Sequence, residues 1–132
     1  MMITTGKLLG LLTAALILLA FSRVTIRVFS PLTDRWLRKA ARALRGKQAL
    51  EAFLLRHHFL FGRLAFLSAL VHGTYNFWQT GRPSVTGLTV FLFLTIQILL
   101  GNFRKVLPWA ARVHRILPHG MLLALIIHIQ KK

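Results

Sequence analysis

Two pairs of histidines in this sequence share one spacing. His58 and His72 are fourteen residues apart, and so are His114 and His128. In an α-helix, fourteen residues turn through about 1400°, within roughly 40° of four full turns, and rise about 21 Å. Both histidines of a pair therefore lie on one face of their helix. If the two helices face each other, they form two facing pairs of imidazoles, one pair near each end of the bundle. Such pairs can bind two b-type haems at their axial positions.

The segments that carry these histidines are long apolar runs. Hydrophobic residues make up 55% of the 132-residue chain, more than an ordinary soluble domain contains. Runs of about 18 or more apolar residues indicate membrane-spanning helices. Such runs occupy residues 8–29, 55–78, 85–103 and 111–130, and Gln97 in the third is expected to donate a hydrogen bond between helices. We therefore expect an all-α integral membrane protein, a single-domain bundle of four transmembrane helices.

Basic residues are distributed unevenly between these runs. The formal net charge is +16, and Asp34 and Glu51 are the only acids. Nine Lys and Arg residues lie in residues 23–56 and four in residues 104–115, whereas the opposite side carries only four. The positive-inside rule then predicts cytoplasmic basic loops and both termini outside, as in a bacterial inner membrane or a similar energy-transducing membrane. Anionic lipid headgroups, and not nucleic acid, are the expected partner of this charge.

The composition excludes several other chemistries. The chain has no cysteine, so it has no disulfide, no thiolate-bound iron–sulfur cluster and no covalent c-type haem. With only two acids in the chain, a carboxylate dyad is disfavoured, and the lack of an acid within the spans weakens a proton-relay hypothesis for the histidines. A single zinc ion cannot use all four histidines, because its ligands must lie about 2 Å away while each pair spans about 21 Å.

A short amphipathic helix is expected at residues 33–45, between the first two spans. Thr33 is a suitable N-cap for it and Gly46 a suitable C-cap. Its basic side chains lie opposite its apolar ones, as in helices that lie in the membrane interface. Anchoring on lipid is the favoured role, and docking of an acidic partner is the alternative.

The second span has a face of small residues between its histidines. Gly62, Ala65 and Ala69 lie within about 40° of the line that joins His58 to His72. Small residues allow close packing of membrane helices. They equally leave room for two flat macrocycles, and the histidines at either end favour that interpretation.

Pro118 complicates the fourth span. It removes a backbone hydrogen bond and is expected to kink the helix, so the alignment of His114 with His128 stays open, and with it one haem versus two. The remaining histidines, His57 and His119, lie about 100° and 140° away from the respective faces. We expect them to face headgroups, neighbouring helices or a quinone, although a severe kink would let His119 replace His114.

Arginines accompany the proposed ligands. Arg56 and Arg112 each precede a histidine by two residues, and Arg63 and Arg115 lie nearby. Arginine pairs with carboxylates through two parallel hydrogen bonds, and haem carries two propionates. Lipid phosphate is an equal candidate for Arg56 and Arg112. Arg63 lies deeper in the span, where a propionate or a helix carbonyl is favoured.

The spacing of the histidines, on the second and fourth of four spans, resembles that of the membrane-bound di-haem b-type cytochromes. The four-helix core of cytochrome b also has a surface helix between its first two spans. Residues 106–109 are similar to a cytochrome b segment, and residues 114–117 to the last haem-binding helix of ferric-reductase-like domains. The resemblance implies that His58 and His114 bind the iron of an inner haem, and that His72 and His128 bind that of an outer haem. The Pro-Glu-Trp-Tyr motif of the cytochrome b quinol site is absent, which places substrate oxidation elsewhere.

The sequence thus predicts an electron-transfer subunit and not an enzyme by itself. Its expected partners are other redox subunits of a membrane complex, with a quinone as a further candidate. Two imidazoles on each iron favour electron transfer over oxygen binding. One alternative is a cofactor-free scaffold in which the histidines only form hydrogen bonds between helices. Another is a pigment-binding subunit in which each histidine binds one chlorophyll magnesium, which the matched spacing disfavours.

Overall fold

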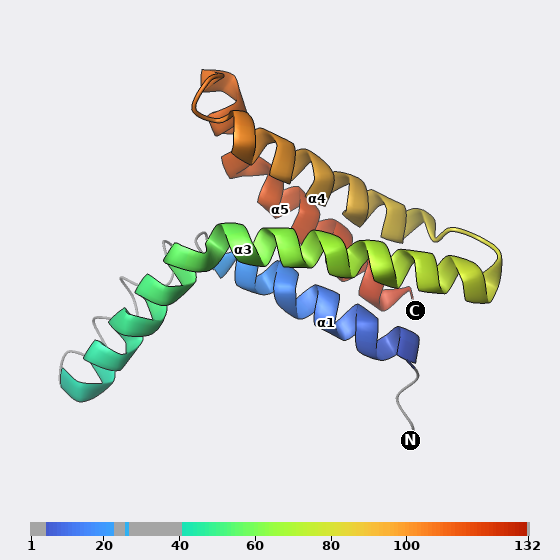
Figure 1. Ribbon diagram of the computed structural model, residues 1–132, viewed down its shortest axis with the longest axis horizontal. Helices are drawn as coiled ribbons and strands as arrows, with labels where there is room; N and C mark the ends of the chain where they lie inside the picture. Colours follow the sequence, from blue (N-terminus) through green and yellow to red (C-terminus); the bar gives the residue numbers. More distant parts are fainter. Residues whose placement is uncertain (1–4, 23–25, 27–40, 132) are drawn as a thin grey trace.

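The computed structural model describes residues 5–22, 26 and 41–131 of the chain. This part of the protein is built from α-helices without any β-strand, which confirms the predicted all-α class. The helices are α1 (Thr5–Ala20), α3 (Ala41–Thr80), α4 (Val85–Phe103) and α5 (Pro108–Gln130). α1 packs along α3, α4 packs along α5, and the two pairs meet where α3 contacts α4 (Figure 1).

Three of the helices are long and apolar enough to cross a membrane, namely α3, α4 and α5. They contain the predicted spans at residues 55–78, 85–103 and 111–130. α1 has 16 residues and rises about 24 Å, less than the roughly 30 Å of a bilayer's hydrocarbon core. Most of the remaining predicted first span, residues 23–25 and 27–29, lies outside the described residues, so its full length stays a prediction.

α3 is 40 residues long and begins well before the predicted second span. The prediction that Gly46 ends a surface helix is wrong, because Gly46 lies inside α3. Glycine within a helix costs about 1 kcal/mol relative to alanine, but good helix formers follow it, and Lys47 Nζ lies 2.9 Å from the Glu51 carboxylate one turn further on. Residues 33–40 of the predicted surface helix lie outside the described residues. Figure 1 shows the first turns of α3 projecting away from the other helices.

The interior of the bundle is small and draws on all four helices. Its buried hydrophobic cluster consists of Ile17, Phe21, Ala65, Val90, Leu94, Met121 and Leu125. Polar side chains also meet between helices: the hydroxyl oxygens of Thr13 and Ser68 lie 2.8 Å apart between α1 and α3. Many large hydrophobic side chains on all four helices are exposed, as expected for helices that face lipid.

The two ends of the bundle differ in their connections. The start of α1, the α3–α4 turn and the end of α5 lie at one end, and the α4–α5 turn lies at the other (Figure 1). We call these the outer and the inner end, following the orientation that the sequence predicts. The outer turn contains Gly81 with a φ of 66° and ends at Ser84, the N-cap of α4. α5 begins at the inner end with Pro108, a position where its missing N–H costs nothing.

Candidate functional site

The two inner histidines face each other between α3 and α5. The ring centroids of His58 and His114 are 6.5 Å apart, and the ring planes cross at 74°. Two imidazoles on opposite sides of one metal ion would have centroids roughly 6.4 Å apart, since each metal–nitrogen bond is about 2 Å and each ring adds about 1.2 Å. The structure therefore brings the predicted inner pair to the separation that one shared metal ion requires.

Each inner imidazole is held by a backbone carbonyl of a neighbouring helix. His58 Nδ1 lies 2.6 Å from the carbonyl oxygen of Ala20, at the end of α1, and His114 Nδ1 lies 3.0 Å from that of Gln97 in α4. A carbonyl oxygen can only accept, so Nδ1 donates, and Nε2 of the neutral ring keeps its lone pair. Metal-binding histidines commonly donate their other ring N–H in this way. Metal binding by either ring would therefore have to use Nε2.

Gln97 joins α4 to α5 a second time. Its Nε2 donates to the carbonyl oxygen of His114 over 2.9 Å, which confirms the predicted interhelical donor. The side chains of Gln97 and His114 thus each donate to the backbone carbonyl of the other residue. These two hydrogen bonds fix the rotation of α5 relative to α4 at the inner end. The Gln97 Oε1 atom is buried and has no hydrogen-bond partner among the described residues.

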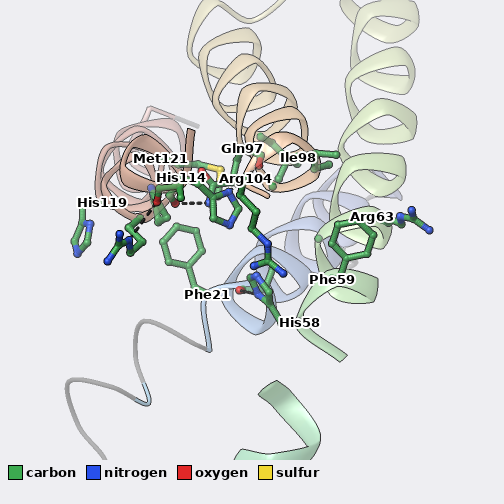
Figure 2. Close-up of a pocket in the computed structure, with 17 residues that line it drawn as sticks. Phe21, His58, Phe59, Arg63, Gln97, Ile98, Arg104, His114, His119 and Met121 are labelled. Atoms are coloured by element: carbon green, nitrogen blue, oxygen red, sulfur yellow. Dashed lines mark hydrogen bonds between the residues drawn. The ribbon is translucent and has the colours of Figure 1, made fainter. Parts of the chain in front are cut away.

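A cavity of about 610 Å³ opens beside the two rings (Figure 2). Its apolar walls include Phe21, Phe59 and Met121. Cofactor pockets typically enclose roughly 300–1,000 Å³ and are mostly apolar. Gly62 also lines the cavity, and a Cβ atom added there would meet no atom within 4 Å. The free space therefore continues up to the backbone of α3.

Cationic side chains line the same cavity. They are Arg63, Arg104 and Arg115, accompanied by His119. The Arg63 guanidinium lies over the Phe59 ring, 4.4 Å from its centroid, while Arg104 extends into the pocket from the end of α4 (Figure 2). An apolar cavity with several guanidinium groups suits a ligand with an apolar body and anionic substituents. Arg104 is not among the residues predicted from the sequence.

Other predicted residues lie away from this cavity. Arg56 and Arg112 are exposed and do not belong to its lining. Ala65 is fully buried in the hydrophobic cluster, and Ala69 packs against that cluster. The small-residue face of α3 is therefore divided, because Gly62 borders open space whereas the two alanines serve helix packing.

The outer histidines have different contacts. His72 is 8% exposed, and the Nδ2 atom of Asn76 lies 3.0 Å from its Nε2 and 3.3 Å from its Nδ1. Its ring also lies against Gly10 of α1, where an added Cβ would come within 3.1 Å of His72 Cε1. His128 Nδ1 lies 2.8 Å from Thr86 Oγ1 in α4. These contacts with side chains replace the backbone carbonyls of the inner end, and neither outer histidine lines the 610 Å³ cavity.

Two glycines let the imidazoles of α5 lie against the backbone of α4. A Cβ added at Gly101 would lie 3.1 Å from His114 Cε1, and one added at Gly87 would lie 3.3 Å from His128 Cε1. The two glycines are fourteen residues apart, the same spacing as the two histidines on the antiparallel helix. This match is visible in the sequence, although neither glycine is among the predicted site residues.

Pro118 does not disturb the alignment of the histidines on α5. It is buried within a continuous helix, and His114 and His128 both contact α4. His119 lines the cavity but does not replace His114, and its Nδ1 lies 3.1 Å from a carbonyl of its own helix. His57 lies outside the cavity lining and likewise bonds to a carbonyl one turn earlier in α3, over 2.9 Å.

Protein side chains alone do not form a metal cage here. Among the described residues, no three His, Cys, Asp or Glu side chains lie close enough together to hold a metal ion. Two facing imidazoles suit a metal ion whose other positions are filled by a macrocycle. Comparisons of the chain with protein-family models, with curated proteins and with solved structures found no match. The function must therefore be inferred from the geometry of the site.

Proposed function

We propose that the protein is a transmembrane electron-transfer subunit, a b-type cytochrome that binds haem between α3 and α5. The observation that carries this proposal is the inner pair, His58 and His114, with ring centroids 6.5 Å apart beside a cavity of about 610 Å³. In this proposal His58 and His114 would hold one haem through Nε2 of each ring. His72 and His128 bind the iron of a second, outer haem.

The residues around the cavity fit a haem in charge and in polarity. Arg63, Arg104 and Arg115 would neutralise its propionates. Gly62 leaves space at the backbone of α3, and apolar side chains keep water from the ring. When bound, haem supplies one-electron redox chemistry, and two imidazole ligands leave no iron position open for oxygen. The protein's part is thus to bind, orient and shield the cofactor.

Placement of one histidine pair at each end supports transfer across the membrane. The two ligands on each helix are separated by about 21 Å along its axis, a large part of the bilayer's hydrocarbon thickness. Electrons would pass between a partner at the inner end and another at the outer end. These partners are other redox subunits, with a quinone as a further candidate near His119, which lines the cavity.

Charge supports the proposed orientation in the membrane. Among the described residues the inner end carries Arg45, Lys47, Arg56, Arg63, Arg104, Lys105, Arg112 and Arg115, and the outer end carries Lys7, Arg82 and Lys131. The positive-inside rule favours a cytoplasmic inner end and termini on the opposite side. Anionic headgroups of a bacterial inner membrane or a similar membrane would neutralise the excess charge.

A cofactor-free scaffold is the second candidate, favoured by one specific observation. The bonds from His58 to Ala20 and from His114 to Gln97 join neighbouring helices, as a purely structural role for these histidines would require. Such a role does not require the two rings to face each other beside a cavity. A pigment site with single histidine ligands does not require it either, so the geometry favours haem.

An oxidised-minus-reduced absorption spectrum of the purified protein, with haem stoichiometry after extraction, tests the proposal. We expect b-type haem, low-spin in both oxidation states, with two haems per chain. The variant with both His58→Ala and His114→Ala is the control and should lose one haem. A folded, colourless wild-type protein would refute the cytochrome and favour the scaffold.

A further inference from the structure

We propose that Thr86 of α4 is a positioning residue that fixes which ring nitrogen of His128 is offered to the outer iron. This inference rests on the proposed function, because His128 is an outer ligand only if the protein is a cytochrome. Thr86 itself would not touch the metal. It would act by accepting the Nδ1 proton of His128, so that Nε2 keeps its lone pair.

The contact between the two side chains is direct. Thr86 Oγ1 lies 2.8 Å from His128 Nδ1 in a partly buried position. Thr86 Oγ1 also lies 3.2 Å from Ser84 Oγ, which accepts the amide proton of Gly87 as the N-cap of α4. A hydroxyl oxygen has two lone pairs, so Ser84 Oγ can accept from the threonine hydroxyl as well. That arrangement leaves the Thr86 oxygen free to accept from histidine.

The same two-part support occurs at both ends of α4. At the inner end, His114 lies against Gly101 and donates to the carbonyl oxygen of Gln97. At the outer end, His128 lies against Gly87, one residue from Thr86. At each end, α4 thus provides a glycine in contact with the imidazole ring and a hydrogen-bond acceptor for its Nδ1 atom. The recurrence indicates that α4 positions both ligands of α5.

The two supports differ in one respect that makes the inference testable. The inner acceptor is a backbone carbonyl, which no substitution removes and which can only accept. The outer acceptor is a side-chain hydroxyl, which valine lacks at nearly the same shape. Without it, either nitrogen of His128 could carry the proton. Loss of such a supporting hydrogen bond commonly weakens metal binding by about 10–100-fold.

The experiment titrates haem into the full-length protein, purified without haem and reconstituted in lipid nanodiscs. Thr86→Val removes the hydroxyl, Thr86→Ser restores it, and Thr95→Val is the matched control. Thr95 lies on the same helix, partly buried, and its hydroxyl donates to the Phe91 carbonyl of its own helix over 2.8 Å. We expect Thr86→Val to weaken the outer haem about 10–100-fold and to leave the inner haem unchanged. Thr86→Ser and Thr95→Val should bind both haems like the wild type.

Nitrogen-15 NMR of the histidine rings provides a readout that does not need haem. We expect His128 of the wild type to carry its proton on Nδ1, and that preference to disappear in Thr86→Val and return in Thr86→Ser. A wild-type proton on Nε2, or unchanged outer haem affinity in Thr86→Val, would overturn the role of Thr86. Failure of the wild type to bind any haem would instead refute the proposed function, and the NMR result would still decide whether Thr86 fixes the tautomer.

Discussion

The inner and outer ends of the bundle carry the same pair of residues but support them differently. His58 and His114 donate to backbone carbonyls and face each other at 6.5 Å beside a cavity. His72 and His128 contact the side chains of Asn76 and Thr86. Equal spacing along the sequence therefore does not produce equal sites.

The two ends differ in how firmly their contacts determine the tautomer of each histidine. A carbonyl at the inner end dictates the tautomer, because it cannot donate a proton. At the outer end the Nδ2 atom of Asn76 lies 3.0 Å from Nε2 and 3.3 Å from Nδ1 of His72, so this contact does not determine which ring nitrogen is left for a metal. We therefore expect the inner site to bind haem more tightly and to fill first. If the protein holds a single haem, the inner pair is the expected site.

Substitution of the proposed histidine ligands should have the largest effect on haem content. It also distinguishes the haem at the inner end from the haem at the outer end. His114→Ala should remove the inner haem and leave the outer one, because the single remaining histidine of that pair does not retain the haem. His128→Ala should remove the outer haem and leave the inner one for the same reason. Haem content after extraction and the difference spectrum measure both. His57→Ala, outside the cavity lining, is the control and should keep the full content. Loss of the same haem in both variants would contradict the assignment to two ends.

Gly101→Ala should weaken the inner haem by about tenfold or more, since displaced or poorly supported ligands commonly cost that much affinity. The added methyl group would lie 3.1 Å from His114 Cε1 and push the ring away from its carbonyl acceptor. Haem titration measures the change. Gly73→Ala is the matched control, because a Cβ there meets no atom within 4 Å. An equal effect of the two substitutions would show that the close approach to Gly101 has no role.

Arg104→Gln should weaken the inner haem about fivefold, equivalent to about 1 kcal/mol, the upper range for an exposed ion pair. Arg104 lines the cavity, whereas Arg112 does not. Arg112→Gln therefore serves as the control and should leave haem affinity unchanged. A titration at low ionic strength gives the clearest difference because salt screens exposed charges. A larger effect of Arg112→Gln would place the propionates elsewhere.

Two glycines of α3 and its following turn should respond oppositely, with the smallest effects. Gly46 lies within the helix, so Gly46→Ala should raise the free energy of unfolding by up to about 1 kcal/mol. Gly81 has a φ of 66°, so Gly81→Ala should lower it by about 1 kcal/mol. Denaturant titration of the purified protein followed by circular dichroism measures both changes. Destabilisation by Gly46→Ala would mean that α3 ends there after all.

Much of the fold could be predicted from hydrophobic runs. These runs located α4, α5 and the membrane-length part of α3. The start of α3 could not be predicted, because Gly46 resembles a local stop signal while the residues after it favour helix. Pro118 suggested a misaligned α5, but the contacts of His114 and His128 with α4 preserve their common face.

The candidate site was predictable only in part. Helix periodicity placed His58 with His72 and His114 with His128 on common faces, and the resemblance to di-haem cytochromes paired His58 with His114, whose rings the structure brings within 6.5 Å. The hydrogen-bond acceptors of their Nδ1 atoms could not be predicted, because the carbonyl groups of Ala20 and Gln97 belong to the backbone, and every residue type has one. Arg104 was missed because its place in the cavity depends on how α4 and α3 approach each other, which local sequence does not encode.

The central claim is that His58 and His114 bind one iron from opposite sides. Electron paramagnetic resonance of the oxidised protein carrying His72→Ala and His128→Ala, which keeps only the inner pair, tests it most directly. Because the two imidazole planes cross at 74°, we expect a strongly anisotropic low-spin ferric signal, as nearly perpendicular axial rings produce. A high-spin ferric signal, or a folded protein without haem, would contradict the account.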